Sequence, residues 1–199
     1  MLEEKREKFK KVSSWTGDVF SKTGLTPNQY TLISLVFVLA AFCFLLKEKL
    51  VWALIFFLLA ILLDFIDGAV ARFLQKETKR GAYLDTICDR YVEGIILLGF
   101  LFLNLPKFLL SAEIWIFLAF LGSLMTTYAK AAAKEKELTT QEFKKGLLGR
   151  PERAILIIIA IFLGIFNLPW AIYPIIILAI LSNFTALQRI ILCLRPSKN

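Results

Sequence analysis

Six long apolar runs, separated by short polar segments, dominate the pattern of hydrophobic and polar positions along this chain. Helices of about 17 to 25 apolar residues are long enough to cross the hydrocarbon core of a bilayer. The pattern therefore predicts an all-α, polytopic membrane protein with six transmembrane helices. We place the spans at about residues 29–46, 50–74, 82–104, 108–133, 152–167 and 170–192.

The segment before the first run follows a different pattern. Residues 3–22 are rich in charge, yet their apolar side chains recur at helical spacing: Phe9, Val12, Trp15, Val19 and Phe20. This arrangement is typical of an amphipathic helix that lies in the membrane interface. We expect no cleaved signal peptide. The chain shows no internal repeat, which favours a single domain over residues 1–199.

Composition supports the membrane class and narrows the possible chemistry. The 199 residues are 58% hydrophobic, with a mean hydropathy of +0.68, far above that of a soluble domain. The three cysteines fall in or beside separate apolar runs, so neither a zinc site nor a disulfide framework is indicated. The chain has no histidine, and any general base is therefore a carboxylate or a lysine.

The net charge is +8, which on a soluble protein would suggest a nucleic-acid partner. Here the basic residues flank apolar spans, and we expect no nucleic-acid partner. Of the 24 Lys and Arg, 21 lie on one side of the predicted membrane, against Lys47, Lys49 and Lys107 on the other. The positive-inside rule then places both termini in the cytoplasm. The longest polar loop, 134–151, is predicted to be cytoplasmic as well, with room for a short helix over 139–145.

Two pairs of aspartates interrupt the apolar pattern. Asp64 and Asp67 close the second run, and Asp85 and Asp89 open the third. Residues three or four apart share one face of a helix, so each pair lines one side of its helix. Four carboxylates within membrane helices cost roughly 10 kcal/mol on insertion scales. Divalent cations offset such a cost, because Mg²⁺, Mn²⁺ and Ca²⁺ prefer oxygen ligands. The pairs therefore predict a metal site on the cytoplasmic side.

The residues around these aspartates form a longer motif. The chain reads D-x-x-D-G-x-x-A-R-x8-G-x3-D-x3-D from Asp64 to Asp89. Eight fixed letters at fixed spacing arise by chance in about one of 10¹⁰ placements. The stretch resembles the signature of the CDP-alcohol phosphotransferase family at every specified position. Capping of two helices by four aspartates is the alternative, but Asp64 and Asp67 lie inside a helical pattern, where capping explains nothing.

The resemblance implies an enzyme that transfers a phosphatidyl or archaetidyl group from a CDP-linked lipid to an acceptor alcohol and releases CMP. It implies two Mg²⁺ ions, replaceable by Mn²⁺, on Asp64, Asp67, Asp85 and Asp89, with Asp89 also acting as the general base. Residues at positions matching the family's contacts with the CDP-lipid are Thr26, Pro27, Asn28, Gln29, Asp67, Gly68, Arg72, Thr78 and Gly81. Similar enzymes are homodimers, which implies a homodimer here.

Basic residues near the cytoplasmic ends of the later spans form a second group: Lys130, Arg150, Arg153 and Arg189. Such charges can be ordinary juxtamembrane residues or can snorkel to water. Alternatively they converge on a phosphate, for which Arg offers bidentate donors. Their contexts, Tyr-Ala-Lys, Arg-Pro-Glu-Arg and Gln-Arg, resemble the inositol-phosphate branch of the family, although Ala132 stands where that branch often has Arg.

This second resemblance implies inositol-1-phosphate as the acceptor, bound through its phosphate by the four basic residues. The donor would be CDP-diacylglycerol or CDP-archaeol. Glycerol-3-phosphate is the alternative acceptor. From other classes, a cation transporter would also use intramembrane aspartates, but it would place polar residues in further spans. A purely structural scaffold would not retain four buried acids.

Overall fold

The chain is helical in a computed structural model that describes residues 2–138 and 147–194. The described residues form no strand; their helices are α1 (Leu2–Ser21), α2 (Pro27–Leu46), α3 (Leu50–Phe73), α4 (Lys79–Phe100), α5 (Ala112–Glu135), α6 (Arg150–Phe166), the short 3₁₀ helix η1 (Leu168–Ala171) and α7 (Ile172–Leu194). The predicted all-α class is confirmed, and each predicted span overlaps one helix. The predicted short helix at 139–145 lies outside the described residues.

Four helical segments in the described part of the chain are long and apolar enough to cross a membrane: α2, α3, α5, and η1 with α7. The chain is therefore a membrane protein. Helix α4 differs because it carries Asp85, Asp89, Arg90 and Glu93 among its apolar residues. Helix α6 is apolar but only 17 residues long. The number of six spans, and the interfacial position of α1, stay predictions.

The connection between α4 and α5 is longer than the sequence pattern predicted. Helix α4 ends at Phe100 and α5 begins at Ala112, whereas the predicted spans ended at 104 and began at 108. Phe108 and Leu110 pair as an isolated antiparallel bridge. The indole Nε1 of Trp115 donates a hydrogen bond to the carbonyl oxygen of Phe108, over 2.8 Å. Because this connection is largely apolar, the sequence pattern assigned part of it to the two predicted spans. In the structure it is a turn that is held by its own hydrogen bonds.

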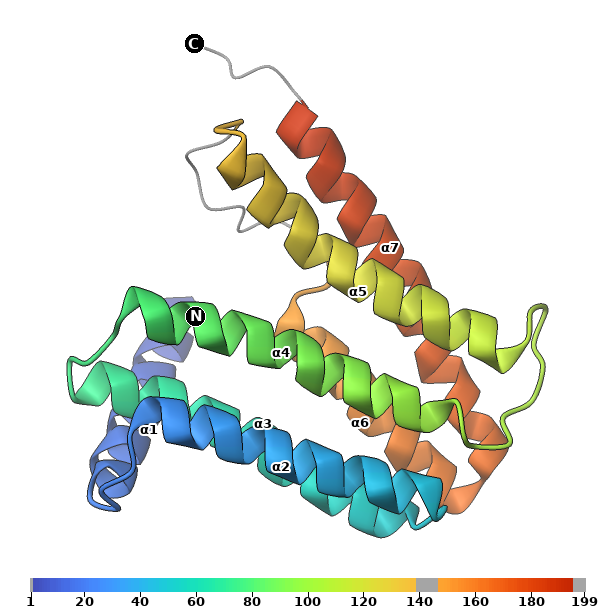
Figure 1. Cartoon of the computed structure of the whole chain (residues 1–199), viewed down its shortest axis with the longest axis horizontal. Coiled ribbons are helices and arrows are strands. Elements are labelled where there is room, and N and C mark those ends of the chain that lie inside the picture. The colour runs from blue at the N-terminus through green and yellow to red at the C-terminus, as the bar shows by residue number, and fades with distance from the viewer. Residues whose placement is uncertain (1, 139–146, 195–199) are drawn as a thin grey trace. The chain divides into compact units, whose positions relative to one another are not determined.

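The chain divides into two compact units, and each is described by itself. The first comprises residues 1–43 and 55–96. Within it α2, α3 and α4 run lengthwise beside one another, and α1 crosses one end (Figure 1). Tyr30, Ile66 and Val70 are buried together between α2 and α3. Gly17 lets α1 approach α3 closely, because a Cβ atom there would lie 2.7 Å from the carbonyl oxygen of Ala69.

The second unit comprises residues 44–54 and 97–199. Within it α5 packs along α7, as Figure 1 shows. Gly122 permits this close packing, since a Cβ atom there would lie 2.7 Å from the backbone nitrogen of Asn183. The Asn183 side-chain amide donates to the carbonyl oxygen of Leu118, over 2.8 Å. Small and polar side chains therefore join these helices, as is common between membrane helices. That both units belong to one domain stays a prediction.

Candidate metal and nucleotide-binding site

Three of the predicted aspartates meet in the first unit. Asp64 and Asp67 on α3 and Asp85 on α4 each offer a carboxylate oxygen, and these oxygens all lie within 4.8 Å of one another. Two ligands on opposite sides of a divalent cation are about 4.2 to 4.8 Å apart, given metal–oxygen distances of about 2.1 to 2.4 Å. The cluster is therefore compact enough, and of suitable chemistry, to hold a hard divalent cation.

Asp67 is the most deeply placed of the three, with 6% of its surface exposed. The Thr31 hydroxyl, on α2, donates a hydrogen bond to the Oδ2 atom of Asp67 over 2.5 Å. The same hydroxyl lies 3.2 Å from the carbonyl oxygen of Pro27, but its one proton serves the nearer carboxylate. This hydrogen bond fixes the direction of the carboxylate, as residues behind a metal ligand commonly do.

The fourth aspartate occupies a different place. Asp89 follows Asp85 by one turn of α4 and is only partly exposed, and it is not one of the carboxylates that cluster within 4.8 Å in the described structure. The geometry therefore separates the predicted metal ligands into a tight group of three and a fourth carboxylate farther along α4.

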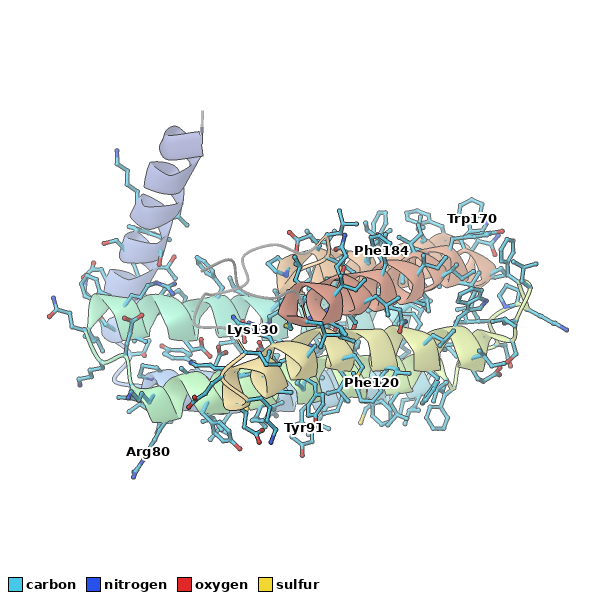
Figure 2. All side chains as sticks on the ribbon, turned by 90° about the horizontal axis from the view of Figure 1, so that it is seen from above. Arg80, Tyr91, Phe120, Lys130, Trp170 and Phe184 are labelled. Carbon is cyan, nitrogen blue, oxygen red and sulfur yellow. The ribbon has the colours of Figure 1, made fainter. Side chains whose placement is uncertain are left out.

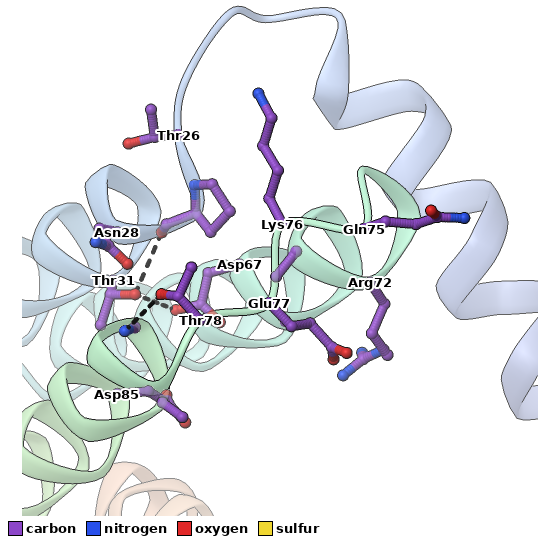
Figure 3. A pocket seen from close by; sticks show the side chains of 15 residues that line it. Thr26, Asn28, Thr31, Asp67, Arg72, Gln75, Lys76, Glu77, Thr78 and Asp85 are labelled. Carbon is purple, nitrogen blue, oxygen red and sulfur yellow. Dashed lines mark hydrogen bonds between the residues drawn. The ribbon is translucent and has the colours of Figure 1, made fainter.

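A pocket of about 530 Å³ opens beside this cluster (Figure 3). Its walls come from the start of α2, the end of α3, the turn that follows and the start of α4: Thr26, Pro27, Asn28, Thr31, Asp67, Gly68, Ala71, Arg72, Gln75, Lys76, Glu77, Thr78, Gly81, Ala82 and Asp85. Eight of the nine residues predicted to bind the CDP-lipid line it, Gln29 being the exception. Motif residues that are distant in sequence thus surround one cavity.

Gln29 instead completes a capping box at the start of α2. Its side-chain oxygen accepts a hydrogen bond from the backbone nitrogen of Thr26 over 2.7 Å, while its own backbone nitrogen lies 3.4 Å from the Thr26 hydroxyl. This reciprocal arrangement satisfies amide groups that a helix start leaves without partners. Gln29 therefore stabilises the start of α2, which forms one wall of the pocket.

The start of α4 is built in a comparable way. The Thr78 hydroxyl accepts a hydrogen bond from the backbone nitrogen of Gly81, over 3.0 Å. A Cβ atom at Gly81 would lie 3.1 Å from that hydroxyl oxygen and 3.3 Å from the side-chain oxygen of Asn28. Glycine thus allows Asn28, from α2, to approach the first turn of α4. The positive ends of two helix dipoles border the pocket as a result, which suits an anionic ligand.

Arg72 supplies a fixed positive charge to the pocket. Its guanidinium lies over Gly68, where a Cβ atom would be 3.2 Å from the Nη1 atom. The family resemblance placed Gly68 among the contacts with the CDP-lipid. The described geometry adds that the missing side chain makes room for the Arg72 guanidinium on the same helix.

The sequence analysis missed several residues of the pocket wall. Thr31, Lys76 and Glu77 stand outside the fixed letters of the motif, although all three line the cavity. Lys76 follows Gln75, which adopts a left-handed backbone conformation, with φ of 52°, just after α3 ends. Glycine usually marks such a position, and its absence removed the only signal that the sequence could have carried.

The predicted acceptor residues lie in the second unit, where two of them meet at Thr126 on α5. The Nη1 atom of Arg153 donates to the Thr126 hydroxyl over 3.1 Å, and the Nη1 atom of Arg189 donates to its carbonyl oxygen over 2.5 Å. Arg153 is only 3% exposed. Both arginines therefore turn inward, which is the opposite of snorkelling. Thr126 itself carried no signal in the sequence.

The other two basic residues are more accessible. Lys130, which is labelled in Figure 2, follows Thr126 by one turn of α5, and its side chain is exposed. Arg150 is the first residue of α6 and is partly exposed. The exposure of Lys130 is therefore compatible with a side chain that snorkels to water. In the described part of this unit, the inward-turned guanidinium groups of Arg153 and Arg189 therefore differ from the exposed side chain of Lys130.

Comparison with known proteins places these features in a family context. Residues 24–189 match the family model described as CDP-alcohol phosphatidyltransferase. The archaetidylinositol phosphate synthase of Pyrococcus horikoshii is 33% identical over 192 residues, which are 96% of this chain and 95% of that protein. The phosphatidylinositol phosphate synthase of Mycobacteroides abscessus is 30% identical over 188 residues, 92% of this chain and 84% of that protein.

Solved structures show the same fold. The phosphatidylinositol phosphate synthase of Mycobacterium tuberculosis with CDP-DAG bound gives a TM-score of 0.81 at 24% identity, over 94% of this chain and 96% of that one. The same enzyme in complex with manganese and citrate gives 0.80 at 25% identity, over 94% and 90%. The helices that carry the aspartates and the arginines therefore belong to a known architecture.

Proposed function

The chain belongs to the CDP-alcohol phosphatidyltransferase family, and from that premise we propose that it transfers a phosphatidyl or archaetidyl group from a CDP-linked lipid to the hydroxyl of inositol-1-phosphate. The observation that carries this proposal is that the three-carboxylate cluster shares Asp67 and Asp85 with a pocket that is also lined by Gly68, Arg72 and Gly81. The phospholipid product remains in the membrane, and CMP is released.

The donor would occupy the pocket of the first unit. A cytidine diphosphate needs positive charge at its phosphates and polar contacts at its sugar and base. Arg72 and Lys76 supply the charge, and the two helix starts add backbone amides. Thr26, Asn28 and Thr78 offer the polar contacts. The solved relative with CDP-DAG bound supports this choice of donor.

Divalent cations would be held by Asp64, Asp67 and Asp85, with Asp89 as a further ligand of a second ion. We propose that the site would hold two Mg²⁺ ions, with Mn²⁺ as a substitute, as two-metal phosphoryl-transfer sites do. When bound, such ions neutralise the pyrophosphate and stabilise the charge that develops on it. The relative solved in complex with manganese and citrate supports the use of a divalent cation.

The remaining chemistry belongs to residues of this chain. Asp89 would accept the proton of the acceptor hydroxyl, since the chain has no histidine to do so. The acceptor oxygen forms a bond to the phosphorus that carries the lipid. The bond from that phosphorus to the bridging oxygen breaks, and its electron pair leaves with CMP. Arg72 stabilises the charge that develops on the leaving phosphate.

The acceptor's own phosphate would bind to the basic group of the second unit. Arg153 and Arg189 are held at a single threonine, where their like charges repel, and a phosphate dianion on them would remove that repulsion. Lys130 and Arg150 would add contacts. Relatives named for inositol phosphate favour this acceptor, and glycerol-3-phosphate is the alternative.

The membrane arrangement follows from the same proposal. We propose six spans, with α1 in the interface and with both termini and the active site on the cytoplasmic side of the cell membrane. The distribution of 21 basic residues against three supports this orientation. We also propose a homodimer, by analogy with similar enzymes. Native mass measurement tests the dimer, and a monomer alone would contradict it.

Acceptor competition tests the proposed activity. The purified protein receives CDP-archaeol or CDP-diacylglycerol with Mg²⁺, and CMP release is followed with inositol-1-phosphate, free inositol, glycerol-3-phosphate or serine. We expect inositol-1-phosphate to be used best. A clear preference for glycerol-3-phosphate would support the alternative acceptor. A preference for uncharged inositol or serine would overturn the proposed phosphate site.

A further inference from the structure

Helix α1 contacts Arg72, a residue that lines the donor pocket, although α1 lies outside the family motif. We propose that Ser13 is a positioning residue that holds the Arg72 guanidinium in place for the donor phosphate. The identity of that phosphate rests on the function proposed above. The contact itself is a property of the described structure and involves only the first unit.

The contact is specific in its atoms. The Ser13 hydroxyl oxygen accepts a hydrogen bond from the Nε atom of Arg72 over 3.3 Å and another from its Nη2 atom over 3.1 Å. Ser13 is buried, with 7% of its surface exposed, so water competes poorly for this hydroxyl. A guanidinium has five N–H donors, and this arrangement leaves three of them for a ligand.

The backbone supports the contact one turn away. Ser13 and Gly17 lie on the same face of α1, and Ala69 and Arg72 lie on the same face of α3. No side chain larger than hydrogen fits at Gly17, because a Cβ atom would lie 2.7 Å from the Ala69 carbonyl oxygen. The close approach of the two helices at this point brings Ser13 within reach of the guanidinium.

The consequence for the donor is pre-organisation. An unanchored arginine samples many rotamers and loses that freedom when it binds a phosphate. One end of the Arg72 guanidinium is already held by Ser13, while its Nη1 atom lies beside Gly68 in the pocket. Ser13 therefore acts through Arg72 and need not touch the donor.

The same helix presents an apolar face away from this contact. Val12, Trp15 and Val19 are exposed on α1, whereas Ser13, Thr16 and Gly17 are buried. Such a face suits the interfacial position proposed for α1. Under the proposed function, the headgroup of a CDP-lipid would also lie in this interface. Ser13 thus connects the helix proposed to lie at the membrane surface to Arg72, the residue proposed to bind the phosphate of the lipid.

Steady-state kinetics of the full chain test the proposal. Ser13→Ala should raise the KM for the CDP-lipid about 3- to 10-fold, the loss expected for one hydrogen-bonding partner of a charged group that acts indirectly. The KM for the acceptor should stay unchanged. Ser13→Thr retains the hydroxyl and should restore most of the affinity. Ser14→Ala is the matched control, because Ser14 is the adjacent, exposed serine.

A double-mutant cycle separates positioning from general destabilisation. In an Arg72→Gln background, Ser13→Ala should cost less than 2-fold, since the group that it positions is gone. An equal cost in both backgrounds would overturn the proposal, as would a loss confined to thermal stability. If the wild-type chain turns over no CDP-lipid, the proposed function fails instead. If Arg72→Gln weakens donor binding and Ser13→Ala does not, only the role of Ser13 fails.

Discussion

Thr31 donates a 2.5 Å hydrogen bond to the Asp67 carboxylate, from a side chain that is itself 3% exposed. The bond joins α2 to the aspartate that lies deepest in the metal cluster. A ligand held in this way keeps its orientation whether or not a cation is bound. The N-terminal part of α2 therefore serves the metal site as well as the nucleotide pocket.

Removing the Thr31 hydroxyl should loosen the cluster. Thr31→Val keeps the shape of the side chain but loses the hydrogen bond to Asp67, and we expect divalent-cation affinity or activity to fall about 10- to 100-fold. Thr31→Ser retains the hydroxyl and should stay close to wild type. Titration with Mn²⁺ under calorimetry measures the affinity. Equal affinities for the valine and serine variants would contradict the role assigned to this bond.

Neutralising a clustered aspartate should have a larger effect. Asp64→Asn, Asp67→Asn or Asp85→Asn should abolish transfer and weaken Mn²⁺ binding, because an amide cannot neutralise a cation. The three variants should behave alike, since their oxygens lie within one 4.8 Å group. Full activity in any of them, at any Mg²⁺ concentration, would remove that residue from the proposed metal site.

Asp89 should behave differently, because it lies outside the cluster and is proposed as the general base. Asp89→Asn should lower the rate of transfer roughly 10²- to 10⁴-fold. The affinity for CMP should change little. Single-turnover rates and nucleotide binding, measured on the same preparation, separate these effects. A variant with normal turnover would show that another group accepts the proton.

Arg153 tests the acceptor site. Arg153→Gln should raise the KM for inositol-1-phosphate roughly 10- to 150-fold, the equivalent of about 1.5 to 3 kcal/mol for one charge-assisted contact. The KM for the CDP-lipid should stay near its wild-type value. Lys134, on the last turn of α5, is exposed, and Lys134→Gln is the matched control. Lower expression with both KM values unchanged would indicate a structural role for Arg153 instead.

The aspartate pairs could be predicted from their spacing along the chain, whereas most of the pocket wall was predicted through the resemblance to the family signature. Residues three or four apart on a helix share a face, so the spacing of each aspartate pair predicts that both carboxylates lie on one side of their helix. The supporting hydroxyls could not be found in that way. Thr31 bonds to a residue 36 positions away, Ser13 to one 59 positions away, and Thr126 to Arg153 over 27 positions. A serine or threonine inside a helix carries no pattern that identifies a distant partner.

Helix boundaries show a related limit. Apolar composition predicted the segments of α4 and α5 but not the turn between them, where hydrogen bonds hold Phe108 and Leu110. Gln29 was matched to the nucleotide site by resemblance, and its hydrogen bonds in the structure are those of a helix cap. Motif positions thus identify which segments meet, while the atoms on each side chain decide what each residue does there.

The product of a defined reaction tests the central claim most directly. Purified full-length protein in lipid is supplied with a CDP-linked lipid, Mg²⁺ and isotopically labelled inositol-1-phosphate, and the extracted lipids are analysed by mass spectrometry. The proposed function predicts a labelled lipid that carries inositol phosphate, formed in equal amount with CMP and absent in the Asp85→Asn variant. Release of CMP without label in the lipid fraction, together with efficient transfer to another acceptor, would contradict it.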